Sequence, residues 1–203
     1  MTRRCAHYLA QLLRSQQSME MLDLSDNAFT DMSMVTMIDG FKVHPALRHL
    51  YLSFNRIGPN GALMVSTALR AMKSKLQSLD LSHNDITDTG AFALAEALNT
   101  NELELESLYL ANCGIEGPGA IALGGTLKTA EKLRMININD NPVVRLHNGM
   151  RMMRACDNTV RARMSHFICK SRVCDACSDC SLFTRRTCRT TMGHKMHPAP
   201  TCT

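Results

Sequence analysis

One pattern, Leu-x-x-Leu-x-Leu-x-x-Asn-x-Ile, constrains the fold of this chain more than any other feature. It occurs five times, starting at Met19, Leu47, Leu76, Leu105 and Leu133, with other apolar residues replacing some Leu and Ile and one Cys replacing Asn. The starts are 28, 29, 29 and 28 residues apart. Repeats of nearly constant length predict a solenoid, in which each repeat buries its apolar side chains against its neighbours.

Within each repeat, motif positions four and six point to the same side of a short strand because they are two residues apart. We expect Leu50, Leu79, Leu108 and Ile136 to stack as one inward row, since parallel strands lie roughly 4.8 Å apart. An Asn at position nine, just after the strand, is expected to bond backbone groups of its own and the neighbouring turn. Cys113 replaces this Asn in the fourth repeat, and we interpret it as structural rather than reactive.

A helix is expected after each strand. The third repeat shows this best, because residues 87–98 combine a polar start with an apolar face that includes Phe92. Residues 5–17 are predicted to form the helix half of an earlier repeat whose strand is absent, either as a cap or as part of a longer array. Several methionines in the helical segments are interpreted as core filler: Met32, Met34, Met37, Met64 and Met72.

A strand joined to a full helix in 28–29 residues resembles the ribonuclease-inhibitor-like class of leucine-rich repeats. That class includes NOD-like receptor sensing domains, Ran GTPase-activating proteins and tropomodulin. The resemblance implies an α/β fold: a right-handed horseshoe with a parallel sheet on the concave side and helices on the convex side. It divides the chain into an incomplete N-terminal repeat or cap (1–18), five repeats (19–158), a degenerate repeat or cap (159–168) and a tail (169–203).

Motif positions three, five and seven are expected to point away from the core, on the concave side. Position five reads Asp, Tyr, Asp, Tyr, Asn along the five repeats, which places two of the three tyrosines in one row. Tyrosine offers a large contact area and a hydroxyl that orients a partner, although tyrosine also simply favours strands. The predicted protein-binding residues are Asp23, His49, Tyr51, Phe54, Asp80, His83, Tyr109 and Asn137, of which Phe54 and His83 lie on the rim at position eight.

The charges are unevenly distributed. Residues 1–144 carry 12 Lys and Arg against 15 Asp and Glu, whereas residues 145–203 carry 11 against 3. The basic tail is expected to be unstructured, and apart from Phe167 and Phe183 no aromatic residues are interleaved with its basic residues, which argues against specific nucleic-acid recognition. No apolar run is long enough for a membrane span. The N-terminus does not resemble a signal peptide, which predicts a reducing compartment, the cytoplasm or also the nucleus, without disulfides.

The tail also concentrates six of the nine cysteines. Cys-x2-Cys spacing lets two thiolates reach one zinc ion, which makes Cys169, Cys174, Cys177 and Cys180 weak candidates for a metal site. The cluster does not contain two such pairs at a recognised separation. We therefore expect no cofactor, with zinc in the tail as the alternative.

The sequence favours a non-catalytic, monomeric scaffold that binds another protein on the concave face. No nucleophile and base occupy neighbouring strand positions in the manner of a catalytic triad. Two alternatives stay open: a GTPase-activating protein of the Ran regulator type, and a fragment of a larger leucine-rich-repeat receptor. A single-turnover GTP hydrolysis assay separates the first alternative from a scaffold.

Overall fold

The computed structural model describes residues 3–72, 75–100, 103–142 and 167–168. Chain contacts divide the protein into two units, and all the described residues belong to the first, Met1–Arg172. The zinc candidates Cys169, Cys174, Cys177 and Cys180 lie outside the described residues. So do residues 143–158 of the fifth repeat and residues 159–166 of the degenerate repeat or cap.

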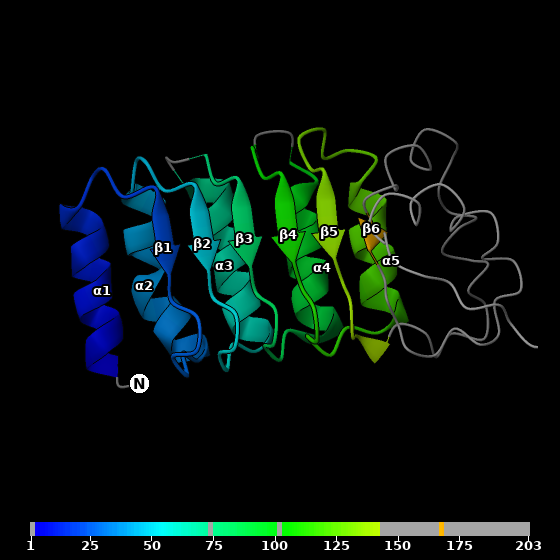
Figure 1. Ribbon diagram of the computed structural model, residues 1–203, viewed down its shortest axis with the longest axis horizontal. Helices are drawn as coiled ribbons and strands as arrows, with labels where there is room; N and C mark the ends of the chain where they lie inside the picture. Colours follow the sequence, from blue (N-terminus) through cyan, green and yellow to red (C-terminus); the bar gives the residue numbers. More distant parts are fainter. Residues whose placement is uncertain (1–2, 73–74, 101–102, 143–166, 169–203) are drawn as a thin grey trace, which may run out of the picture. The chain divides into compact units, whose positions relative to one another are not determined.

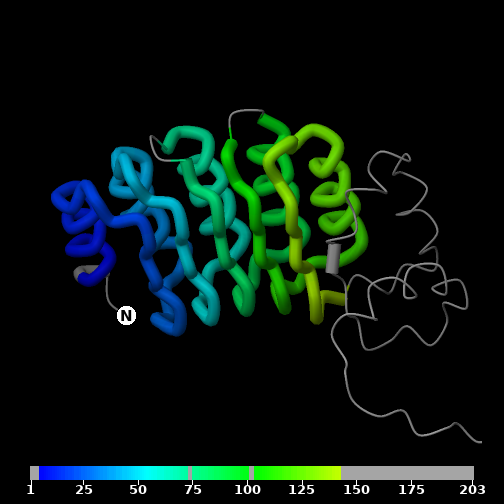
Figure 2. The backbone as a smooth tube through the Cα atoms, turned by 45° about the horizontal axis from the view of Figure 1, so that its top comes forward, coloured from blue at the N-terminus to red at the C-terminus, as the bar shows by residue number. Residues whose placement is uncertain are grey.

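Strands and helices alternate along the described chain, and Figure 1 shows the strands side by side in front of the helices. Figure 2 shows the same segments as successive coils of the backbone. The strands are β1 (Met21–Asp23), β2 (His49–Tyr51), β3 (Ser78–Asp80), β4 (Ser107–Tyr109), β5 (Met135–Asn137) and β6 (Phe167–Ile168). The helices are α1 (Arg3–Ser15), α2 (Asp31–Val43), α3 (Pro59–Ala71), α4 (Thr87–Leu98) and α5 (Gly117–Thr126).

The sheet is parallel, and its strands follow one another in sequence order from β1 to β6. Position four of each motif pairs with position four of the next, so that Leu50 lies opposite Leu79, Leu79 opposite Leu108 and Leu108 opposite Ile136. These four side chains are at most 2% exposed. The predicted inward row is therefore confirmed, and with it the α/β solenoid.

The position-nine residues tie each repeat to the one before it. The Nδ2 atoms of Asn55, Asn84 and Asn141 donate to the carbonyl oxygens of position six in the preceding repeat at 2.6–2.9 Å. The Cys113 thiol donates to the equivalent carbonyl, that of Leu81, at 3.2 Å. Burial raises the pKa of Cys113 to about 12, so this thiol stays protonated and is a structural group, as the sequence indicated.

Two aspartates connect repeats on the helix side. Oδ1 of Asp31, at the start of α2, accepts a hydrogen bond from the Gly58 N–H at 2.6 Å, just before α3. Asp88 does the same at α5, where its Oδ1 accepts from the N–H groups of Glu116 and Gly119 at 2.7 and 3.1 Å. A Cβ on Gly119 would collide with that carboxylate oxygen, so a larger residue here would displace the carboxylate from these two N–H groups.

Two expectations for helix side chains were wrong. Met32 is 55% exposed and Phe92 is 48% exposed, although both were placed in the core. Phe92 occupies the same place in its repeat as Val35, Leu63 and Ile121, and all four are more than 40% exposed. Each helix is buried only towards its own strand and the adjacent helices, so this position faces outwards in each of these four repeats.

Among the five methionines, Met34 and Met37 are fully buried, and Met64 and Met72 pack partly against the core. In α1, Leu13 is buried together with Ala6 and Ala10, whereas Leu12 is 40% exposed.

Candidate functional site

The outward side chains of the strands form the candidate binding surface. We define the sheet face as motif positions three, five, seven and eight of the five repeats. Strand register brings Asp23, Tyr51, Asp80, Tyr109 and Asn137 into one row across it, as each residue is paired with the next. A second row reads Met21, His49, Ser78, Ser107 and Met135. The structure thus places six of the predicted binding residues in two adjacent rows.

The position-five row alternates between two roles. In repeats one, three and five, a side-chain oxygen of Asp23, Asp80 or Asn137 accepts a hydrogen bond from the backbone N–H two residues later, at 2.8–3.0 Å. This Asx turn ends the strand. The acidic residues of the row therefore have a structural role, which the repeat pattern did not predict.

Tyr51 and Tyr109 occupy the repeats in between and cannot form this turn. Both side chains are partly exposed, and neither hydroxyl forms a hydrogen bond with another described residue. The Ser25 N–H and hydroxyl hold the pKa of Asp23 below its ordinary value, so one end of the row stays ionised at neutral pH. Two hydroxyl groups and a carboxylate are thus available to a partner.

Position eight forms a further row along the rim, just after the strands. Its residues, Asp26, Phe54, His83, Asn112 and Asp140, all have left-handed backbone conformations with φ between 50 and 57°. Backbone hydrogen bonds connect the row, because the N–H of Phe54 donates to Ser82 O and that of His83 to Ala111 O. The predicted residues Phe54 and His83 are therefore neighbours.

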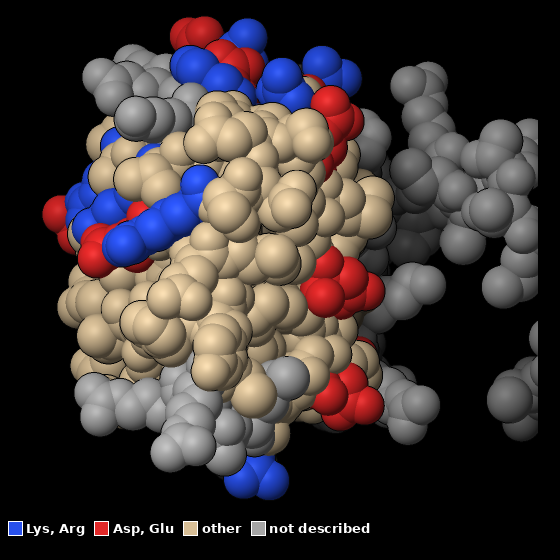
Figure 3. All heavy atoms as spheres, turned by 90° about the vertical axis from the view of Figure 1, so that its left-hand side faces the viewer, with Lys and Arg blue, Asp and Glu red and all other residues tan. Residues whose placement is uncertain are grey.

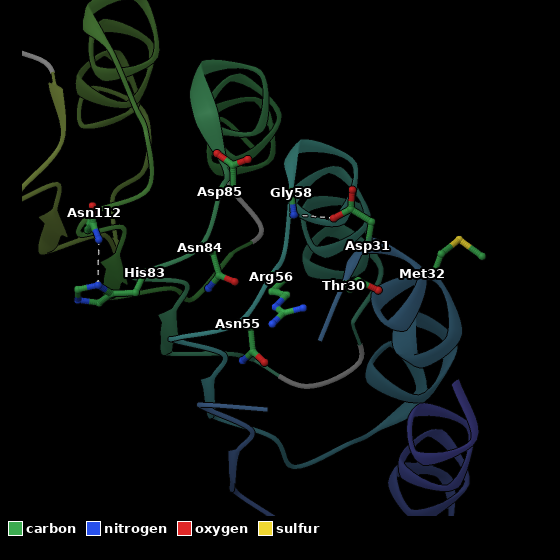
Figure 4. Close-up of a pocket in the computed structure, with 10 residues that line it drawn as sticks. All are labelled: Thr30, Asp31, Met32, Asn55, Arg56, Gly58, His83, Asn84, Asp85 and Asn112. Carbon is green, nitrogen blue, oxygen red and sulfur yellow. Dashed lines mark hydrogen bonds between the residues drawn. The ribbon is translucent and has the colours of Figure 1, made fainter. Parts of the chain in front are cut away.

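The rings of Phe54 and His83 stack on each other, with centroids 3.9 Å apart and an angle of 9° between their planes. Nδ1 of His83 lies 3.1 Å from Nδ2 of Asn112 in the next repeat, which Figure 4 shows as a dashed line. The sequence pattern predicted that both rings lie on the rim but did not predict their contact. The contact could have been predicted from the repeat spacing, because residues 54 and 83 are one 29-residue repeat apart and therefore lie in adjacent repeats.

A shallow hollow of 530 Å³ lies beside this rim, where the strands lead into the helices (Figure 4). Arg56, Asp85 and His83 line it together with the position-nine residues Asn55 and Asn84. The two asparagines are occupied by the hydrogen bonds that join the repeats. The remaining polar groups offer a surface for recognition rather than an enclosed site for a small molecule.

Charges of both signs gather at the opposite edge of the sheet, where the strands begin. Glu104 lies 3.8 Å from Lys75 and 3.7 Å from Lys132, and Glu106 lies 3.6 Å from Arg134. These surface pairs largely neutralise one another. Figure 3, which looks onto the flank at the α1 end, shows acidic side chains along the strand-side margin and a broad uncharged area beside it.

Comparison with known proteins supports the leucine-rich-repeat fold. A family model described as Leucine Rich repeat matches residues 43–66, 73–95 and 105–124. No curated protein matches the chain in sequence. Among solved structures, one titled "Leiomodin-1 Actin-Binding Site 2 (ABS2)" is similar with a TM-score of 0.60 and 20% identity, covering 76% of this chain and 86% of that one. In the part of the chain that the structure describes, no helix has the length and apolar character needed to cross a membrane.

Proposed function

We propose that this protein is a non-catalytic scaffold that binds a partner protein on its sheet face. The observation that carries the proposal is the difference between members of the position-five row. Asp23, Asp80 and Asn137 each hold a turn, whereas Tyr51 and Tyr109 present rings and hydroxyls that the turns do not use. Tyrosine is enriched among the residues that dominate binding energies at protein interfaces.

The similar solved structure supports the same class of function. Its title describes an actin-binding site, so a solenoid with this arrangement of strands and helices serves as a binding module in that protein. The repeat length of 28–29 residues and the full helix in each repeat also support the ribonuclease-inhibitor-like class. At 20% identity the likeness concerns the fold, and the partner of the present chain is a separate question.

The chemistry of the sheet face also favours binding over catalysis. Among the described residues, His83 hydrogen-bonds an asparagine side chain, and neither His49 nor His83 contacts a serine or cysteine as a base would contact its nucleophile. The Cys113 thiol is buried and bonded to a backbone carbonyl. A surface without a paired nucleophile and base suits recognition.

Site-specific photo-crosslinking tests the proposal. A photoreactive phenylalanine analogue replaces Tyr51 or Tyr109 in the full chain, and the cross-linked protein is identified, purified and used for affinity measurements. Tyr8 is the matched control, because this third tyrosine is 67% exposed on α1, away from the sheet face. We expect the same cross-linked partner from positions 51 and 109, and not from position 8.

The double variant Tyr51→Ala/Tyr109→Ala should then bind that partner at least about tenfold more weakly, as expected when contact residues at the centre of an interface are lost. The temperature of unfolding should stay nearly unchanged, because both side chains are partly exposed. The Tyr8→Ala variant should retain its affinity. Undiminished affinity in the double variant would contradict the proposal.

A further inference from the structure

Phe54 is the exceptional residue of the position-eight row. The other members of the row, Asp26, His83, Asn112 and Asp140, are of the residue types that most readily adopt a left-handed backbone. Phe54 adopts it at φ 53° although phenylalanine disfavours this conformation. Its side chain is also 57% exposed. Neither the backbone nor the core of the solenoid therefore requires phenylalanine at this position.

The stack on His83 fixes the direction of the Phe54 ring. His83 belongs to the following repeat and covers one face of the ring with nearly parallel planes. The normal of the Phe54 ring therefore points along the row of repeats, and its second face is turned towards the preceding repeat. Asp26 is the position-eight residue of that repeat, and its N–H donates to Ser53 O at 2.9 Å, immediately before Phe54.

Asp26 is exposed, and its carboxylate forms no hydrogen bond or ion pair with another described residue. The surrounding charge has the same sign. Four aspartates, Asp23, Asp26, Asp80 and Asp140, occupy the sheet face, and none of its residues is Lys or Arg. Arg56, two residues after Phe54, lines the neighbouring hollow instead (Figure 4). The sheet face is thus complementary to a cationic segment.

We propose that an arginine of the partner protein stacks on the open face of Phe54 and pairs with the Asp26 carboxylate. A guanidinium group is planar, so it continues the stack that His83 begins, and its edge donates N–H groups to a carboxylate beside the ring. A lysine ammonium pairs with Asp26 but cannot stack as a plane. A neutral ring stacks but leaves Asp26 unpaired. This inference rests on the proposed function and names the chemistry of its partner.

The chain provides a matched pair of charge variants. Asp26→Asn and Asp140→Asn each remove one negative charge from the position-eight row, at a residue with φ 57°. Asparagine keeps the left-handed backbone. Asp26 adjoins Phe54 in the row, whereas Asp140 lies three repeats beyond it. If the attraction is diffuse, both variants should weaken peptide binding equally. If arginine stacks on Phe54 and pairs with Asp26, Asp26→Asn should weaken peptide binding more than Asp140→Asn.

The probe is a fluorescein-labelled hexa-arginine peptide, compared with hexa-lysine of the same charge, and the dissociation constant with the full chain is measured by fluorescence anisotropy. We expect hexa-arginine to bind about five- to tenfold more tightly than hexa-lysine, as cation–π stacking predicts. Phe54→Asn should abolish this preference. Asp26→Asn should weaken hexa-arginine binding several times more than Asp140→Asn does.

Three results would overturn the inference: equal affinity for the two peptides, a preference that persists in Phe54→Asn, or equal losses in the two aspartate variants. Absence of binding by low-millimolar peptide would also overturn it. Thermal unfolding of each variant confirms that the fold is retained. Failure here is separable from failure of the proposed function, because cross-linking from positions 51 and 109 does not depend on Phe54 or Asp26.

Discussion

Two rows of side chains run next to each other where the strands end, one residue apart in the sequence. From the second repeat onwards, the position-nine row, Asn55, Asn84, Cys113 and Asn141, is buried, and each side chain donates to a carbonyl of the preceding repeat. The position-eight row shares only its left-handed backbone and varies from Asp to Phe. In the position-nine row the residue type is restricted, because buried polar atoms must be paired. In the position-eight row the residue type varies, because only the backbone conformation is fixed.

The strands show the same contrast between inward and outward positions, and substitutions at these positions should have the largest effect on the free energy of unfolding. Leu79 is fully buried, whereas Ser78 beside it faces outwards. Leu79→Asp should lower the free energy of unfolding by more than about 4 kcal/mol, because it buries an unpaired charge. Chemical denaturation measures this loss. Ser78→Asp, the control, should change stability by only about 0.5 kcal/mol, and a cooperatively folded Leu79→Asp variant of normal stability would contradict the register.

The next largest effect is expected from substitutions that compare the position-nine and position-eight rows directly. Asn84→Ala should lower the free energy of unfolding by about 3 kcal/mol, because it removes the bonds to Leu52 O and Leu81 O and leaves the Ile57 N–H unpaired. His83→Asn, one residue earlier, keeps a residue that tolerates the left-handed backbone and should change stability by about 0.5 kcal/mol or less. Equal losses in urea denaturation would remove the distinction between the rows.

The smallest effect is expected at Phe54 and has the opposite sign. Phe54→Asn relieves an unfavourable left-handed phenylalanine but loses the stack on His83, so stability should be unchanged or higher by up to about 1 kcal/mol. The same variant should lose the preference for arginine peptides. A loss of more than about 1 kcal/mol in thermal unfolding would instead assign Phe54 a structural role.

Much of the inner structure could be predicted from single residues and their spacing. The inward row of Leu50, Leu79, Leu108 and Ile136 and the role of Cys113 follow from a period that repeats five times. The burial of helix side chains was harder to predict, because Phe92 is apolar but faces outwards. Apolar character alone does not reveal which side of a helix a neighbouring repeat covers.

The candidate site was only partly predictable for a related reason. Alternation along each strand identified the outward residues, including Tyr51 and Tyr109. It did not reveal that Asp80 binds the backbone of its own turn, or that Asp31 caps the helix of the next repeat. These contacts depend on the direction in which a short polar side chain turns, which the repeat pattern does not specify.

The amino-acid sequence by itself determined the repeat, its strand and the identity of the buried rows, because burial and hydrogen-bond pairing limit which residues are tolerated there. Tertiary structure alone decided which exposed side chains meet. The stack of Phe54 on His83 exists because successive coils bring residues one repeat apart into van der Waals contact. Burial does not restrict the residue type at exposed positions, so the contacts between exposed side chains cannot be predicted from a single sequence and are seen only in the structure.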